Sequence, residues 1–197
     1  MPELMKLGAL ILAAGAATRM GGIKQLLPYR GRTFVEHAIE QAQQANFTPV
    51  VVVVGAQAEA VAQAVARTSA ESVVNRNWAS GMGSSIGCGL ARILELSPHL
   101  DALAVLLADQ PLVTAAHLEK MGRVFALNNA PILAASYAST VGVPAIFRSG
   151  VFARLRKLPP DAGARALLRG GDAEVERYNL PEAALDIDTP DDFAAVL

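Results

Sequence analysis

Residues that form covalent or metal-centred cross-links are scarce in this sequence. Its 197 residues include one cysteine, Cys88, and three histidines. A lone cysteine excludes a disulfide within the chain, and three scattered histidines offer no cluster with the spacing of a zinc site. The fold must therefore rest on an apolar core, which a domain of this length can build.

Excess charge and long apolar runs are also missing. The 17 Lys and Arg residues nearly balance the 18 Asp and Glu residues, which gives a formal net charge of -1 and no general attraction to nucleic acid or an anionic membrane. The longest apolar runs, Pro49 to Gly55 and Ala102 to Ala108, are much shorter than the roughly 20 residues of a membrane helix. No signal-peptide pattern opens the sequence. We expect a cytoplasmic protein without nucleic-acid or membrane partners, in which a local site binds any anion.

Apolar runs alternate with helical patterns along the chain, which is typical of a mostly parallel sheet with helices on both faces. Up to residue 126 the predicted strands are Leu7–Ala13, Pro49–Val54, Glu71–Val74 and Ala102–Ala108, and the predicted helices are Thr33–Ala45, Gln57–Ala66, Ser84–Leu96 and Ala115–Ala126. Residues 127–197 predict a hairpin of Ile132–Tyr137 and Val143–Phe147, a helix at Ala162–Leu168, a strand at Glu174–Tyr178 and a helix at Pro190–Val196. We therefore expect one α/β domain over residues 1–197, with ligands at the carboxyl ends of its strands.

The stretch "ILAAGAATRMGGIKQLLPYRG" follows the first strand and combines small residues with two cations. Gly15 and the alanines around it let backbone N–H groups approach a phosphate, and Arg19 and Lys24 can neutralise that phosphate. The spacing matches neither a P-loop nor a Gly-x-Gly-x-x-Gly fingerprint. A flexible connection with two solvated cations is the alternative interpretation.

A second glycine-rich loop, "NRNWASGMGSSIGCGL", follows the third strand and leads into a helix. Gly83, Ser84 and Ser85 at the helix start indicate a site for an anion or a polar ligand, although a serine there can equally be a plain N-cap. Trp78 can stack on a base, but packing in the core is the more common role of a tryptophan.

Acidic residues at two places in the chain are candidate metal ligands. Asp109 ends an apolar strand, and Asp186 and Asp188 lie in "LDIDTPDDF". Magnesium is typically bound by one or two carboxylates together with substrate phosphates, which makes these residues candidate metal ligands. Capping is the alternative: Asp109 can cap a turn, and Asp186 or Asp188 can cap the helix that Pro190 begins, for which Thr189 is also well placed.

Taken in order, "LILAAGAATRMGGIKQLLP", "NWASGMGSSI", "LLADQP", "GVPAIF" and "DIDTPDD" resemble the molybdenum cofactor cytidylyltransferase branch of the MobA-like nucleotidyltransferases. The resemblance spans nearly the whole chain. It implies a three-layer Rossmann-like fold, akin to that of the nucleotide-diphospho-sugar transferases. It further implies transfer of a nucleotidyl group from an NTP with Mg²⁺, and for this branch CTP and molybdenum-bound molybdopterin as substrates.

The resemblance also assigns roles to individual residues. It places Ala13, Ala14 and Gly15 against the nucleotide, Arg19 and Lys24 on the triphosphate, and Asp109 with Asp188 on Mg²⁺, with Asp186 as the other choice for the second carboxylate. It further implies that Asn75, Gly83, Ser84 and Ser85 bind the nucleotide, with Asn75 and the two serines facing the base and ribose. Arg19, Lys24 and Asp109 form the expected catalytic set.

The acceptor side departs from the family pattern. Ser139 replaces the first glycine of Tyr-x-Gly-x-x-Gly-x-Pro, and Pro160 stands in "PDAGAR" where the family often has Gly-Asp-x-Gly-Ala-Arg. We expect residues 1–126 to bind the nucleotide and residues 127–197 to bind the acceptor, with a molybdenum hydroxylase or its chaperone as a further partner. A guanylyl- or cytidylyltransferase with a sugar or polyol phosphate as acceptor, and a non-catalytic nucleotide- or cofactor-binding protein, remain alternatives.

Overall fold

A mixed β-sheet forms the middle layer of the protein. The structure is a computed structural model that describes residues 5–16, 20–168 and 174–197. Across the sheet the strands run in the order β5 (Glu71–Val74), β4 (Val50–Val54), β1 (Leu7–Ala13), β6 (Ala102–Leu107), β8 (Thr140–Arg148), β7 (Ile132–Tyr137) and β9 (Val175–Asn179). Of these described strands only β8 is antiparallel to its neighbours. The expected α/β fold with a mostly parallel sheet is thus confirmed.

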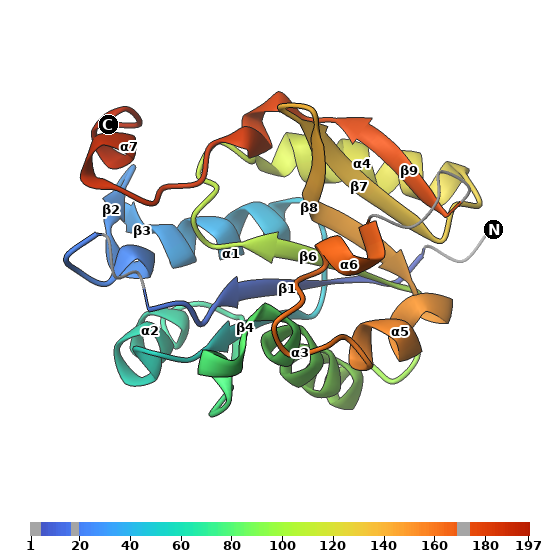
Figure 1. Ribbon diagram of the computed structural model, residues 1–197, viewed down its shortest axis with the longest axis horizontal. Coiled ribbons are helices and arrows are strands. Elements are labelled where there is room, and N and C mark those ends of the chain that lie inside the picture. The colour runs from blue at the N-terminus through green and yellow to red at the C-terminus, as the bar shows by residue number, and fades with distance from the viewer. Residues whose placement is uncertain (1–4, 17–19, 169–173) are drawn as a thin grey trace.

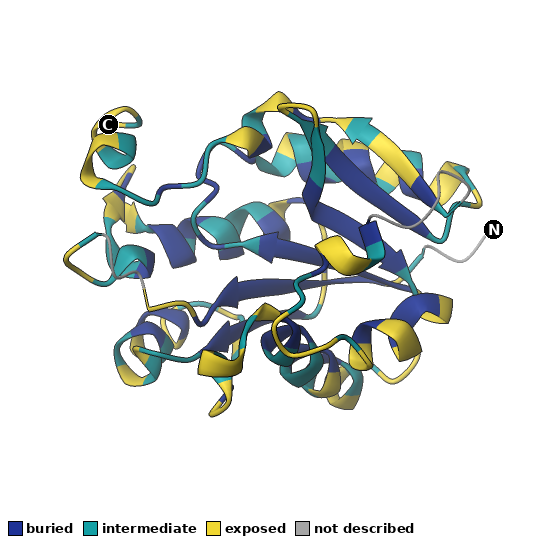
Figure 2. Ribbon diagram, in the orientation of Figure 1, coloured by how far each residue is buried: buried dark blue, intermediate teal, exposed yellow. Residues whose placement is uncertain are grey.

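Helices cover both faces of the sheet (Figure 1). One core layer contains side chains of α1 (Phe34–Gln44), α2 (Ala58–Val65) and α4 (Ala115–Leu127), and the other contains side chains of α3 (Met82–Leu96), α5 (Phe152–Arg156) and α6 (Arg165–Leu168). Successive side chains of a strand point to opposite faces, so Ile11 enters the first core layer and Leu10 the second. Burial on both faces explains why the central strands are continuous apolar runs, dark blue in Figure 2.

A third, smaller core joins the C-terminal segment to the start of the chain. Tyr29, Phe34 and Ile187 are buried together, and Phe193 from α7 (Pro190–Ala194) packs edge-on against Phe34 with ring centroids 5.8 Å apart. Tyr29 belongs to a small ribbon of β2 (Pro28–Tyr29) and β3 (Arg32–Thr33). In Figure 1 the C-terminus lies beside α7, close to β2. This packing brings residues 185–190 next to the loop that follows β1, of which residues 14–16 and 20–24 are described and which is called the glycine loop below.

The bounds of most elements follow the sequence pattern, with a few differences. The strands at Leu7–Ala13 and Glu71–Val74 have the predicted bounds. The predicted hairpin is present, but its second strand starts earlier, at Thr140. The helix expected over Ala162–Leu168 is shortened to Arg165–Leu168, because the preceding residues pack on the start of α3. Among the described residues no helix has both the length and the apolar character needed to span a membrane.

The segment at residues 159–162 packs tightly against the first turn of α3. Gly83 N–H donates to the Pro160 carbonyl at 2.9 Å, and a Cβ on Gly83 would lie 2.1 Å from the Pro159 carbonyl oxygen and 2.6 Å from that of Ala162. By contrast, a Cβ on Gly87, one turn along the same helix, would meet no atom of the described residues within 4 Å. The contact therefore ties the part of the chain after residue 126 to a helix that precedes it.

Two glycine substitutions test this contact. Gly83→Ala is expected to lower the free energy of unfolding, because overpacking against backbone typically costs about 1–3 kcal/mol and outweighs the helix propensity of alanine. Gly87→Ala is expected to raise the free energy of unfolding by up to about 1 kcal/mol, the usual gain over glycine within a helix. Urea denaturation of both variants measures the difference, and equal effects at the two positions would contradict the described packing.

Candidate active site

A cavity of about 480 Å³ opens at the carboxyl ends of β1 and β6, where ligands of parallel sheets bind. It collects residues from the glycine loop, the loop before α3, the end of β6 and the C-terminal segment. Its lining comprises Leu12, Ala13, Ala14, Gly15, Lys24, Gln25, Trp78, Ala79, Gly81, Met82, Ser85, Leu107, Ala108, Asp109, Asp186 and Asp188. Seven of the residues predicted from the sequence, Ala13, Ala14, Gly15, Lys24, Ser85, Asp109 and Asp188, therefore lie around one space.

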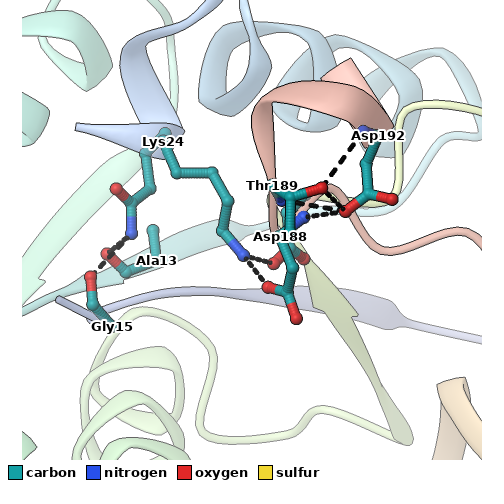
Figure 3. A network of polar contacts seen from close by, with 8 residues as sticks. Ala13, Gly15, Lys24, Asp188, Thr189 and Asp192 are labelled. Atoms are coloured by element: carbon teal, nitrogen blue, oxygen red, sulfur yellow. Dashed lines mark hydrogen bonds and ion pairs between the residues drawn. The ribbon is translucent and has the colours of Figure 1, made fainter. Parts of the chain in front are cut away.

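Lys24 bridges two carboxylates in this cavity. Its Nζ lies 2.5 Å from Asp109 Oδ2 and donates a hydrogen bond of 2.8 Å to Asp188 Oδ1. The three side chains come from distant parts of the chain: Lys24 begins the 3-10 helix η1 (Lys24–Leu26), Asp109 follows β6, and Asp188 precedes α7. Figure 3 shows Lys24 reaching across to Asp188, with Ala13 and Gly15 on the side of Lys24 away from Asp188.

The capping box of α7 fixes the backbone that carries Asp188. Thr189 is the N-cap residue: its Oγ1 accepts from the Asp192 backbone N–H at 3.2 Å, and its own N–H donates to Asp192 Oδ2 at 2.8 Å. The Asp188 N–H also donates to Asp192 Oδ2, at 3.1 Å (Figure 3). Thr189 thus takes the capping role that was the alternative for Asp186 and Asp188, and the Asp188 carboxylate faces Lys24.

The charges of this cluster affect one another. Burial lowers the pKa of Lys24, but the carboxylates of Asp109 and Asp188 outweigh that effect and raise the pKa above its usual value, so the amine is protonated at neutral pH. Burial raises the pKa of the Asp186 carboxyl, and the negative charge of Asp109 raises it further. Asp186 lines the same cavity as Asp109 and Asp188 and so adds a third carboxyl group to it.

The cluster also contains buried oxygen atoms without partners. Asp109 Oδ1 and Asp186 Oδ1 are both buried, and neither accepts a hydrogen bond from the residues that the structure describes. Unpaired buried carboxylate oxygens are costly, and hard divalent cations prefer such oxygens as ligands. Across residues 5–16, 20–168 and 174–197, no three His, Cys, Asp or Glu side chains are placed to hold a metal ion by themselves. The donor set fits a divalent ion that shares its coordination with a substrate's phosphate groups.

Gln25 was not predicted from the sequence, yet it shapes the glycine loop. Its side chain is buried, and Nε2 donates to the carbonyls of Ala13 at 3.2 Å and Gly15 at 3.0 Å. These two bonds hold the backbone where β1 ends and the loop begins. A glutamine beside the apolar run Leu26–Pro28 was the available signal, because a buried glutamine needs hydrogen-bond partners.

Three of the residues expected at the nucleotide do not line the cavity. The buried Asn75 donates from Nδ2 to Ser84 Oγ at 2.8 Å and to Ser85 Oγ at 3.0 Å. Gly83 donates its N–H to Pro160, as described above, and only Ser85 of this group reaches the cavity. The helix starts two residues before the predicted Ser84, with Gly81 as its N-cap, so neither serine is the cap. Asn75 thus holds the two serines in place through these hydrogen bonds. Direct contacts of Asn75, Gly83 and Ser84 with the nucleotide stay predictions.

Trp78 lines the cavity and also packs on the core. Its half-buried side chain contacts the α3 side of the sheet. A Cβ on Gly55 would lie 2.6 Å from Trp78 Cβ and 2.7 Å from the Ala14 carbonyl oxygen, so the lack of a side chain at Gly55 leaves room for both Trp78 and Ala14. The position of Trp78 is compatible with both roles considered from the sequence. Arg19, the other predicted phosphate ligand, lies outside the described residues.

The comparison with known proteins agrees with this geometry. A family model described as the MobA-like NTP transferase domain matches residues 9–177. The chain is 34% identical to nicotine blue oxidoreductase of Paenarthrobacter nicotinovorans, over 95% of this chain and 94% of the relative. It is 28% identical to the purine catabolism protein PucB of Bacillus subtilis strain 168, over 94% of this chain and 93% of that protein.

Solved structures show the same fold. The crystal structure of Rv0371c from Mycobacterium tuberculosis H37Rv matches with a TM-score of 0.83 and 32% identity, over 99% of both chains. The same protein in complex with manganese matches with a TM-score of 0.80 and 31% identity, over 98% of both chains.

Proposed function

The chain belongs to the MobA-like NTP transferase family and is a nucleotidyltransferase, and on that premise we propose that it transfers CMP from CTP to molybdenum-bound molybdopterin and releases pyrophosphate. The observation that carries the proposal is the Lys24, Asp109 and Asp188 cluster in a cavity at the carboxyl ends of β1 and β6. A cation beside two carboxylates, next to the small residues Ala13, Ala14 and Gly15 that line the same cavity, is suited to binding a metal-complexed triphosphate.

In this proposal the residues position the reactants more than they react. The loop at Ala13, Ala14 and Gly15 holds the nucleotide so that a phosphate oxygen of the acceptor attacks the α-phosphorus in line with the departing pyrophosphate. Lys24 stabilises the negative charge that builds on the leaving group, and Arg19 assists it. Asp109 and Asp188 hold the divalent metal, which when bound neutralises phosphate charge.

We infer Mg²⁺ as the metal. All candidate ligands are carboxylate oxygens, which are hard donors, and two carboxylates plus substrate phosphates is the usual composition of a magnesium–nucleotide site. The manganese complex of the mycobacterial relative supports a divalent ion of this class. Asp186 is the other candidate for the second carboxylate, because it lines the same cavity and keeps one buried oxygen without a partner.

The preference for CTP and molybdopterin rests on the motif resemblance. Ala13 and Ala14 before Gly15 match the cytidylyl form, whereas the guanylyl branch typically has Ala-Gly-Gly there. Residues 1–126 would bind the nucleotide and residues 127–197 the molybdopterin, and a molybdenum hydroxylase or its chaperone would receive the product. The contact between Pro160 and Gly83 supports this division, since it places the second segment beside the nucleotide cavity.

A different phosphorylated acceptor, such as a sugar or polyol phosphate, is the second candidate. Two departures from the family pattern favour it, and one has a structural context: Ser139 lies at the tip of the β7–β8 hairpin with φ of 61°, a backbone conformation that favours glycine. The departure therefore concerns the shape of a turn in the segment proposed to bind the acceptor. Transfer assays that compare molybdopterin with such phosphates separate the two candidates.

The name of the Paenarthrobacter relative points to redox chemistry, which the site itself does not favour. Hydride transfer to a nicotinamide requires a bound dinucleotide, and the loop after β1 lacks the Gly-x-Gly-x-x-Gly spacing of that class. A lysine shared by two carboxylates is instead the charge pattern of a metal–phosphate site. A purely binding role is likewise less consistent with the cluster, because binding alone does not require charges at the departing phosphates.

Thermal unfolding in the presence of nucleotides tests the substrate choice. With CTP and Mg²⁺ we expect the largest increase in Tm among CTP, GTP, ATP and UTP, because a ligand at about a hundred times its Kd adds roughly 2.7 kcal/mol of stability. Omission of Mg²⁺ should reduce the shift. NADH and NADPH serve as controls for the redox alternative. A larger shift with GTP would contradict the cytidylyl assignment, and the absence of any NTP shift would contradict the proposed phosphate loop.

A further inference from the structure

The amine of Lys24 lies between the two carboxylates that are proposed to hold the metal. Its Nζ is within 2.8 Å of one oxygen of Asp109 and one of Asp188, and only 12% of its side chain is exposed. A divalent ion bound by the same two oxygens would lie close to that ammonium group. Two cations in such proximity repel each other strongly in a partly buried site, so both cannot occupy it together.

We propose that the Lys24 ammonium and a divalent metal are mutually exclusive partners of the Asp109–Asp188 pair, so that metal binds well only when a triphosphate draws Lys24 away. The proposal rests on the metal site assigned above. It gives Lys24 a second role: the lysine neutralises the acidic pair in the free protein and engages phosphate in the complex.

The side chain of Lys24 is suited to such an exchange. An ammonium group on a flexible four-carbon stem can swing between partners, because it acts as a point charge without the directional fork of arginine. The backbone at Lys24 is held in place, because the neighbouring Gln25 is buried and donates hydrogen bonds to the carbonyls of Ala13 and Gly15. The head group can therefore move while the backbone stays in place, and the phosphates beside the loop would provide its new partner.

The exchange predicts cooperative binding of metal and nucleotide. A metal ion alone must displace Lys24 and leave it without a partner, whereas a metal that arrives with a triphosphate supplies that partner. By linkage, each ligand raises the affinity for the other by the same factor. In the free protein, Lys24 thus suppresses metal binding even though it supports turnover.

Titration of the nucleotide-free protein with Mn²⁺, followed by the electron paramagnetic resonance signal of the free ion, tests the proposal. Lys24→Met removes the charge and keeps most of the side-chain length, and we expect it to bind Mn²⁺ at least tenfold more tightly than the wild type, which corresponds to about 1.4 kcal/mol. Lys24→Gln is the second variant, and circular dichroism verifies that each is folded. Lys120→Met is the matched control, because it removes an equal charge from an exposed position on α4.

The outcomes separate this inference from the proposed function. Tighter binding in Lys24→Met that is lost again in the double variant Lys24→Met/Asp109→Asn supports the exchange and locates the ion at the carboxylates. Unchanged or weaker Mn²⁺ binding in both Lys24 variants overturns it, as does a gain that survives the Asp109 substitution or is matched by Lys120→Met. No nucleotide enters this titration, so a protein that fails to bind any NTP would overturn the proposed function and leave the metal result standing.

Discussion

Replacement of Asp109 by asparagine is expected to lower the rate of pyrophosphate release by roughly 10²- to 10³-fold, the loss typical of removing one electrostatic stabiliser from an active site, in a protein that remains folded. Asp109 follows β6 and pairs with Lys24 through Oδ2, while its buried Oδ1 has no hydrogen-bond partner within the described part of the chain. Asparagine keeps the shape of the side chain but offers a neutral amide to the metal and to Lys24. The substitution should therefore lower the metal-dependent turnover rate.

The matched control for this substitution is Asp191→Asn. Asp191 is an exposed carboxylate in the first turn of α7, three residues from Asp188, and its loss changes the net charge equally. Turnover of this variant should stay near that of the wild type. Initial rates at several Mg²⁺ concentrations, with circular dichroism as the test of folding, provide the comparison. A folded Asp109→Asn protein with unimpaired magnesium-dependent turnover would end the metal assignment.

Substitution of Lys24 by alanine has the second large effect that we expect: a loss of kcat on the order of 10²-fold or more. Lys24 pairs with both carboxylates that are proposed to bind the metal, and charge grows on the leaving pyrophosphate only as the reaction proceeds. An interaction that strengthens in the transition state appears mainly in kcat, whereas one that only binds substrate appears mainly in KM. Steady-state kinetics of Lys24→Ala beside Lys120→Ala makes this measurement.

A rise in KM with unchanged kcat would show that Lys24 only binds the nucleotide and would contradict its assigned role in the transition state. The combination with the metal titration is more informative than either experiment alone. Loss of the Lys24 charge is expected to strengthen Mn²⁺ binding to the free protein and to weaken turnover. Few structural defects change these two quantities in opposite directions.

The sequence predicted the sheet well because the central strands are buried on both faces. A run such as Val50–Val54 admits few other interpretations when turn residues flank it, and the buried strand at Leu7–Ala13 was predicted with its observed bounds. Prediction was weaker where contacts between distant segments set the limits of an element. The start of α3 and the shortened α6 both depend on how residues 159–162 pack against Gly83, which no local pattern encodes.

For the candidate site, the sequence identified residue types more reliably than their partners. Lys24, Asp109 and Asp188 were each expected near a metal or phosphate, but their mutual contacts depend on the small core around Phe34 and Phe193, which brings the C-terminal segment to the glycine loop. The supporting role of Asn75 and the loop contacts of Gln25 likewise arise only in three dimensions. Such hydrogen bonds join residues nine to twelve positions apart and leave no periodic trace.

Nucleotidyl transfer is tested most directly with CTP labelled at its α-phosphorus. With Mg²⁺ and molybdenum-bound molybdopterin, we expect label to enter the pterin product and one pyrophosphate to be released for each label transferred. Release of inorganic phosphate without transfer of label would contradict the proposed function. The absence of pyrophosphate with CTP, GTP, ATP and UTP alike, against molybdopterin and against sugar or polyol phosphates, would contradict it as well.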